Sequence, residues 1–445
     1  MVSGLVALAP GHRFAAAQRL RAHPAPSRGA HVVQRYSAPP AGARRARRLG
    51  VTITAYPSRR RSCVPWHLVV AMPAASLPRA VEAGNTAVVP FADARYQELI
   101  AAQPQVRSFL ESFRTAFGHQ LRPSIVIRDR EAERMQADDL AALRNSIALA
   151  AVIKARTDRC MHRFGGEGPV YADLFELYPV NLAMDGETLM VQTAAEFGMD
   201  DDLARFQGQP HPGYIYPQTV RPEFDDTLLE SLMRFWQRQP VDQDEERFRR
   251  LVFRSLETAY HALASPFLNL GSEYDHTLAL ALWVSAFEIL LGREGNVSAD
   301  AVERQISRVG WQHAALRRDL VESARGPRPG RPVLRPVQVY SRLYKVRNEA
   351  LHGGTITKHL VLHRLGEQEE DAPALSLLRA DEWNHLAVAV PALYRGVLLD
   401  LLAQTGFHRH ADAPADIEEY GDYLEMYDDQ RYFEKPLLFR CRHRR

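Results

Sequence analysis

Residues 340–354 read YSRLYKVRNEALHGG, and residues 278–292 read LALALWVSAFEILLG. In and just before the first segment, Val339, Leu343 and Val346 recur at the spacing of one helix face. The two glycines that close it favour helix termination. The second segment is apolar almost all round, which is typical of a buried helix. Together the two segments predict a helical bundle in the C-terminal half of the chain.

The same periodicity predicts further helices on both sides of these segments, and strand patterns occur only earlier in the chain. We therefore predict a mainly α fold with a smaller α+β part, in which an N-terminal α+β module precedes a C-terminal antiparallel helical bundle. The predicted bundle helices are 228–238, 245–263, 275–291, 299–311, 337–352 and 381–404. The module is predicted to contain a helix over 96–117 that is interrupted near Pro104, strands at 124–128 and 188–192, and a helix over 138–156.

Four regions follow from these patterns. We predict a disordered basic leader over 1–75, an α+β module of unknown role over 76–225, the helical domain over 226–405 and a charged aromatic tail over 406–445. The tail is expected to be solvated, to bind a partner or to fold back.

The 445 residues are 46% hydrophobic and 24% charged, a composition that excludes fibrous and wholly disordered classes. No run of about 18 apolar residues occurs, so we predict no membrane span. The three cysteines are far apart and odd in number, which argues against a disulfide framework and favours a reducing, cytoplasmic location.

Charge is distributed unevenly along the chain. Residues 1–71 hold 12 arginines and no acidic residue, whereas the remainder holds 44 basic and 53 acidic residues, a net charge of −9. The net charge of +3 therefore originates in the leader, and phosphate binding elsewhere must be local. The leader is interpreted either as a disordered arm or as the product of a misassigned start, with the protein beginning near Met72.

Arg347 and His352 are the candidate catalytic residues of the predicted 337–352 helix. A helix C-terminus favours the protonated form of His352. Five residues at 100° each separate the two side chains by about 140°, so one helix does not readily aim both at one atom. A composite site becomes possible where two copies of the helix meet in a homodimer.

The segment Arg347 to His352, with Asn348 after the arginine, resembles the R-x4-H signature of the HEPN superfamily (higher eukaryotes and prokaryotes nucleotide-binding). Segment 278–292 is similar to the apolar, glutamate-bearing helix of Apea-like HEPN domains. The resemblance covers about 228–405. Spacing alone is not specific, because Arg114 with His119 and Arg308 with His313 share it.

The resemblance implies a metal-independent endoribonuclease that leaves a 2′,3′-cyclic phosphate, needs no cofactor and acts as a homodimer in stress response or phage defence. His352 would act as general acid or base, Arg347 would stabilise the phosphorane, Asn348 would orient either group, and Glu288 would orient Arg347. The alternatives are structural roles for these residues, in a non-catalytic RNA-binding or partner-binding scaffold, or in a regulatory protein that acts on a protein partner.

Positive charge is concentrated before the signature. Between residues 300 and 347 there are eleven basic and four acidic residues. Part of this charge lies in 323–336, SARGPRPGRPVLRP, which we predict to be an extended, mobile loop. It is either a solvated loop or an RNA-binding segment. The candidate residues for RNA backbone contacts are Arg328, Arg331, Arg335, Arg342 and Lys345.

Metal binding is not predicted. Cys160 with His162, and His408 with His410, could each supply two ligands, but neither pair has a partner pair at a recognisable spacing.

Overall fold

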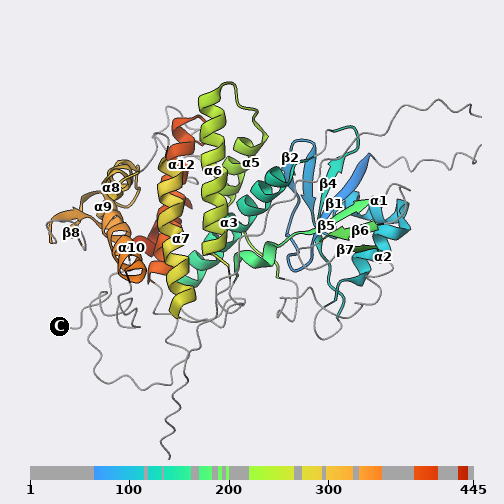
Figure 1. Cartoon of the computed structure of the whole chain (residues 1–445), viewed down its shortest axis with the longest axis horizontal. Coiled ribbons are helices and arrows are strands. Elements are labelled where there is room, and N and C mark those ends of the chain that lie inside the picture. The colour runs from blue at the N-terminus through green and yellow to red at the C-terminus, as the bar shows by residue number, and fades with distance from the viewer. Residues whose placement is uncertain are drawn as a thin grey trace, which may run out of the picture. The chain divides into compact units, whose positions relative to one another are not determined.

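The computed structural model is mainly helical with an N-terminal sheet region, which confirms the predicted fold class (Figure 1). It describes residues 65–114, 119–132, 135–161, 170–182, 189–192, 197–199, 220–264, 273–292, 297–323, 330–352, 385–408 and 429–438. Residues 61–445 belong to one compact unit. No helix within the described ranges is long and apolar enough to cross a bilayer.

The N-terminal region is built on an antiparallel sheet with strand order β2-β3-β4-β1-β5-β6-β7. Only β4 and β6 were predicted, as the strands at 124–128 and 188–192. The strands are β1 (Trp66–Met72), β2 (Val81–Ala83), β3 (Thr86–Val89), β4 (Ser124–Asp129), β5 (Tyr178–Leu182), β6 (Leu189–Gln192) and β7 (Phe197–Met199).

Successive residues of β1 and β4 enter two different cores, because side chains alternate across a strand. Ala71 and Ile125 pack with Tyr96 of α1 (Ala94–Ala102) and with α2 (Pro104–Ser112). Val70 and Val126 join the larger core that includes α3 (Ala137–Met161). The predicted interruption at Pro104 is confirmed, since this proline begins α2.

The predicted leader was wrong at its C-terminal end. Trp66–Met72 forms β1, the strand between β4 and β5, so the sheet begins ten residues before the predicted boundary at 75/76. A chain that started at Met72 would lack nearly all of this strand. Residues 1–64 lie outside the described ranges.

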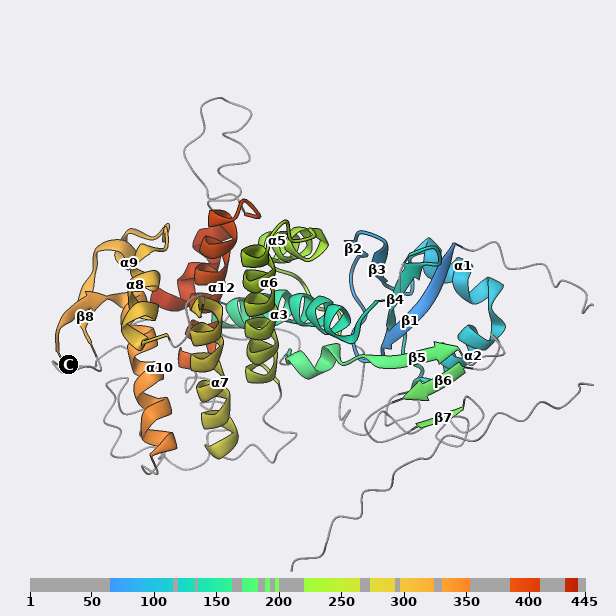
Figure 2. The same ribbon diagram turned by 45° about the horizontal axis from the view of Figure 1, so that its top comes forward.

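The helical region contains the predicted helices with small shifts at their ends. Polar side chains at Asp225, Asp242 and Ser298 accept backbone N–H groups and so begin α5, α6 and α8. The helices are α5 (Asp226–Gln237), α6 (Gln243–Ala262), α7 (Glu273–Leu291), α8 (Ala299–Arg308), α9 (Ala314–Arg318), α10 (Arg335–Leu351) and α12 (His385–Gln404). Figure 2 shows α6, α7 and α10 side by side, and α6 contacts α7, which contacts α10.

The centre of the bundle is aromatic. Phe287 of α7 lies between Tyr340 of α10 and Tyr394 of α12, with ring centroids 5.4 Å from each. Gly396 of α12 lies against Trp311, because an added Cβ would be 2.5 Å from the indole Cζ3 atom. Helix α3, although it precedes the predicted boundary at 225/226, packs against α5, α6 and α12.

The predicted loop over 323–336 was wrong in its second half. Pro332–Leu334 forms β9, which pairs with β8 (Leu320–Glu322), and Arg335 begins α10. Strands of three residues, LVE and PVL, are too short to show an alternating apolar pattern, so sequence periodicity does not reveal them.

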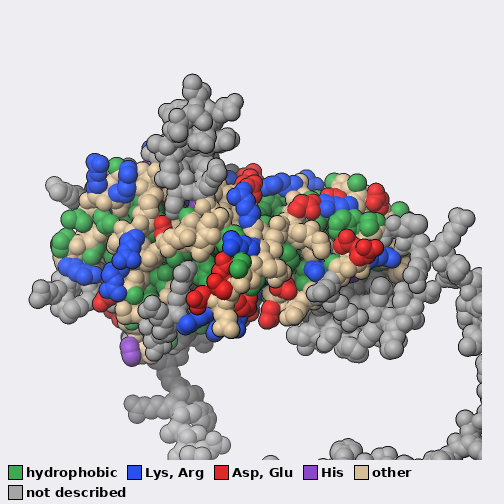
Figure 3. Space-filling view, turned by 90° about the horizontal axis from the view of Figure 1, so that it is seen from above, with side chains coloured by type: hydrophobic (Ala, Val, Ile, Leu, Met, Phe, Trp, Pro, Cys, Tyr) green, Lys and Arg blue, Asp and Glu red, His purple; other side chains and the backbone are tan. Residues whose placement is uncertain are grey.

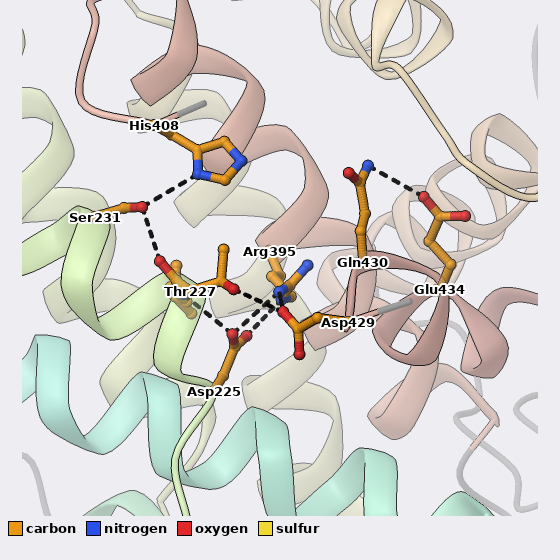
Figure 4. A network of polar contacts seen from close by, with 9 residues as sticks. Asp225, Thr227, Ser231, Arg395, His408, Asp429, Gln430 and Glu434 are labelled. Atoms are coloured by element: carbon orange, nitrogen blue, oxygen red, sulfur yellow. Dashed lines mark hydrogen bonds and ion pairs between the residues drawn. The ribbon is translucent and has the colours of Figure 1, made fainter. Parts of the chain in front are cut away.

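A C-terminal helix over 429–438 packs onto the bundle and belongs to its core through Phe433 and Leu437. Its Asp429 joins a buried network centred on Arg395 of α12 (Figure 4). The Arg395 guanidinium donates two hydrogen bonds to the Asp225 carboxylate and a third, of 3.3 Å, to Asp429. Thr227 Oγ1 also donates to Asp429, at 2.7 Å. One guanidinium thus binds both Asp225, which caps α5, and Asp429 of the C-terminal helix.

Burial and charge oppose each other in this network. Burial alone would lower the pKa of Arg395, but the facing carboxylates of Asp225, Asp429 and Glu434 raise it. Burial raises the pKa of Asp429, and the positive charge of Arg395 only partly offsets that effect. The network therefore holds a permanent cation beside the Asp429 carboxylate, whose pKa is raised by burial.

Candidate active site

Helix α10 fixes the position of the candidate catalytic residues. Its buried face, with Tyr340, Leu343 and Val346, anchors it in the bundle. Arg347 and Asn348 follow on the half-buried part of the helix, where the Arg347 Nη1 atom donates a 3.0 Å hydrogen bond to Asn348 Oδ1. The Arg347 guanidinium lies 5.8 Å from the Tyr344 ring centroid, within cation–π range. A neighbouring amide and ring thus hold the guanidinium.

Glu288 of α7 lies within electrostatic reach of Arg347. Burial raises the pKa of Glu288, and the positive charge of Arg347 lowers it in part. The contacts of the described residues include no hydrogen bond between the two side chains, and Arg347 bonds Asn348 instead. The predicted orienting role of Glu288 would therefore act through its charge.

His352 ends the helix and is exposed. Its backbone N–H donates to the Asn348 carbonyl oxygen at 3.0 Å, which places His352 in the terminal turn as predicted. Arg347 is half-buried and His352 is exposed, as expected of side chains that point about 140° apart. Within the described ranges no contact joins them, so one α10 helix presents them separately. The predicted terminating glycines 353 and 354 lie outside the described residues.

Exposed leucines lie at the same end of the bundle as His352. Leu351 is 61% exposed and Leu278, near the start of α7, is 57% exposed. The C-terminal end of α10 and the N-terminal end of α7 lie together at one end of the bundle in both views (Figures 1 and 2). The surface beside the candidate site is thus partly apolar.

The predicted RNA-contacting residues separate into different environments. Arg335 is only 7% exposed, and its Nη1 atom donates to the Leu438 carbonyl oxygen at 2.9 Å. Arg331 forms a 2.6 Å ion pair with the buried Glu303. Arg342 and Lys345 are half-buried on α10, and Arg328 lies outside the described residues. Arg335 is thus engaged in an internal contact, whereas the Arg331 side chain pairs with Glu303 and stays 52% exposed.

Sequence reasoning missed the C-terminal helix and the side chains that it brings to the bundle. The signal available was a short amphipathic run over 429–438, but adjacent acidic and tyrosine residues made the segment resemble a solvated tail.

No group of three or more potential metal ligands occurs among the described residues. No family model, curated protein or solved structure matches the chain.

Proposed function

We propose that the protein is a metal-independent endoribonuclease of the HEPN type that acts through Arg347, Asn348 and His352. One observation carries the proposal. The Arg347 guanidinium is held by Asn348 one turn before an exposed terminal histidine, so a cation and a proton-transfer group occupy the accessible end of one helix. The resemblance of residues 347–352 to the HEPN signature adds to this support.

The chemistry needs these two groups and little else. The RNA 2′-oxygen attacks the adjacent phosphorus, and the bond from phosphorus to the 5′-oxygen breaks, which leaves a 2′,3′-cyclic phosphate. One group must accept the 2′-hydroxyl proton, and another must give a proton to the 5′-oxygen. Arg347, which stays charged and can grip two phosphate oxygens, offsets the charge that builds on the phosphorane.

A second copy of the chain would supply the missing proton-transfer group. Each α10 helix offers one terminal histidine, whereas the reaction uses an acid and a base. Two α10 ends facing each other would place a His352 on either side of the phosphate and would cover the exposed Leu351. The proposal therefore includes a homodimer through this end of the bundle.

Cleavage of labelled single-stranded RNA and matched DNA in EDTA tests the proposal. We compare the intact protein with Arg347→Ala and His352→Ala, and we expect RNA-only cutting that each substitution reduces by about 10²- to 10⁴-fold. The matched control is the double substitution Arg114→Ala and His119→Ala, which removes a pair with the same spacing. The control variant should cut like the intact protein.

The products identify the reaction class. A 2′,3′-cyclic phosphate end supports attack by the 2′-hydroxyl. A folded, dimeric protein that binds RNA but cuts none would contradict catalysis and would favour the scaffold alternative. Equal cutting by the Arg347 and His352 variants and the intact protein would remove these residues from the site.

A further inference from the structure

Basic side chains lie on α9 and on the C-terminal helix over 429–438, two segments joined through His313 and Glu434. The His313 Nε2 atom hydrogen-bonds the Arg431 carbonyl oxygen at 3.0 Å. Arg431 and Lys435 both act electrostatically on the His313 ring. Arg317 and Arg318 form the exposed last turn of α9. We define these five residues as the cationic surface.

The carboxylate of Glu434, next to Lys435 in the sequence, faces inward. Glu434 is 3% exposed, and its two oxygens accept the backbone N–H groups of Gln312 and His313, each at 2.7 Å. The Glu434 carboxylate is therefore hydrogen-bonded to two backbone N–H groups inside the fold. Between Arg431 and Lys435 no acidic side chain points outward.

Other carboxylates of this region are also engaged. Glu303 pairs with Arg331 at 2.6 Å, and Asp319 faces Arg335 at 3.9 Å. Each of these contacts joins one carboxylate to one arginine outside the cationic surface. In Figure 3, Lys and Arg side chains gather at the end of the bundle that holds α8 and α9, and most visible Asp and Glu lie elsewhere.

The cationic charges already act on the histidine among them. Burial lowers the pKa of His313, the hydrogen bond to the Arg431 carbonyl oxygen partly offsets this, and the positive charges of Arg431 and Lys435 lower it further. An anion bound beside these side chains would offset their charge and raise the His313 pKa again. A measured rise in the His313 pKa would therefore report anion binding at these side chains.

We propose that the cationic surface binds the phosphate backbone of single-stranded RNA without regard to sequence, as a contact separate from the α10 C-terminal end. The choice of RNA rests on the proposed function. The contact of Arg335 with Leu438 places the C-terminal helix beside the first turn of α10. The far end of α10 is then roughly 24 Å away, at 1.5 Å per residue. At about 3.4 Å per stacked nucleotide, an RNA of about seven nucleotides reaches both.

Fluorescence anisotropy with labelled 20-nucleotide oligouridine tests the proposal, in a His352→Ala background that prevents cleavage. The test variant carries Arg317→Gln, Arg318→Gln and Lys435→Gln. The control variant carries Arg247→Gln, Arg250→Gln and Arg254→Gln on the exposed face of α6, which removes the same charge. We expect the test variant to bind at least tenfold more weakly and to show a salt slope lower by about two. The control should stay within about twofold of the parent.

Two further readouts sharpen the test. The His313 pKa, followed by NMR, should rise when oligouridine is added to the parent and should respond less in the test variant. A four-nucleotide RNA is too short to span both contacts, so its cleavage by the otherwise intact enzyme should be unchanged by the three substitutions.

Failure of the inference can be told from failure of the proposed function. Equal losses in the test and control variants, no loss in the test variant, or no RNA binding by the parent would each overturn the cationic surface. Weaker binding by the test variant alone, in a protein that cuts nothing, would support the surface and reject the ribonuclease.

Discussion

The two ends of α10 use arginine for different purposes. At the beginning, Arg335 is buried, donates to the Leu438 carbonyl oxygen and faces Asp319. At the other end, Arg347 is half-buried, contacts mainly its own helix, and precedes the exposed His352. The first end is covered by the C-terminal helix, and the second lies at the surface. An arginine count in the sequence gives both ends equal weight, but the α10 arginine at the first end is buried and the one at the second end is half-buried.

The largest loss of stability should come from removing Arg395, which binds the C-terminal helix that lies over the first end of α10. Arg395→Leu leaves Asp225, which is fully buried, without its guanidinium partner. We expect the free energy of unfolding in urea to fall by about 3–5 kcal/mol, since an uncompensated buried charge remains. Arg247→Leu on α6 serves as the exposed control. A loss below about 1 kcal/mol for Arg395→Leu would mean that the network does not hold the C-terminal helix.

The same substitution made at each end of α10 should give the next largest effect on stability. Arg335→Met deprives the Leu438 carbonyl oxygen of its donor, and we expect a loss of about 1–3 kcal/mol. Arg347→Met, the matched change at the accessible end, should alter stability by less than about 1 kcal/mol. Thermal unfolding of both variants measures the contrast, and equal losses would erase the distinction between the two ends.

A smaller effect should depend on pH. Burial raises the pKa of Asp429, so a charged Asp429 at pH 7 costs the fold stability. Asp429→Asn removes this cost, and we expect a higher unfolding temperature than the parent at pH 7. As the pH falls through the raised pKa toward the ordinary value of 3.8, the parent becomes protonated and the difference should close. A variant that is less stable at pH 7 would show that attraction to Arg395 outweighs burial.

The smallest stability effect should come from the accessible end. Asn348→Ala removes the acceptor of the Arg347 hydrogen bond at a half-buried position, and stability should change by no more than about 0.5 kcal/mol. RNA cleavage should nevertheless fall, because the guanidinium loses its orientation. Parallel melting and cleavage assays separate the two quantities. Unchanged cleavage would reduce Asn348 to a surface residue.

Much of the helical region was predictable from periodicity. The predicted helix over 275–291 is observed as Glu273–Leu291, and that over 337–352 as Arg335–Leu351. Such segments bury one face or their whole surface, so their apolar spacing reports the fold directly. Short strands such as Val81–Ala83 escaped prediction, because three residues are too few for an alternation to be distinguished from chance.

The candidate site was predictable only in part. The terminal position of His352 follows from helix length and the glycines after it, and this placement is confirmed. The partners of Arg331, Arg335 and Arg395 are Glu303, Leu438 and Asp225, each at least 28 positions away. Such pairings depend on how helices dock, and neither local charge nor spacing encodes them. This is why the burial of Arg335 could not be predicted from the sequence.

The bond between Asp225 and Arg395 also sets an order in time. The two residues are 170 positions apart. At about 5–20 residues per second, a ribosome needs roughly 10–30 s to add Arg395 after Asp225. During that interval the Asp225 carboxylate has no guanidinium to accompany it into the core. We therefore expect closure of the bundle to wait until Arg395 has been synthesised and can reach Asp225.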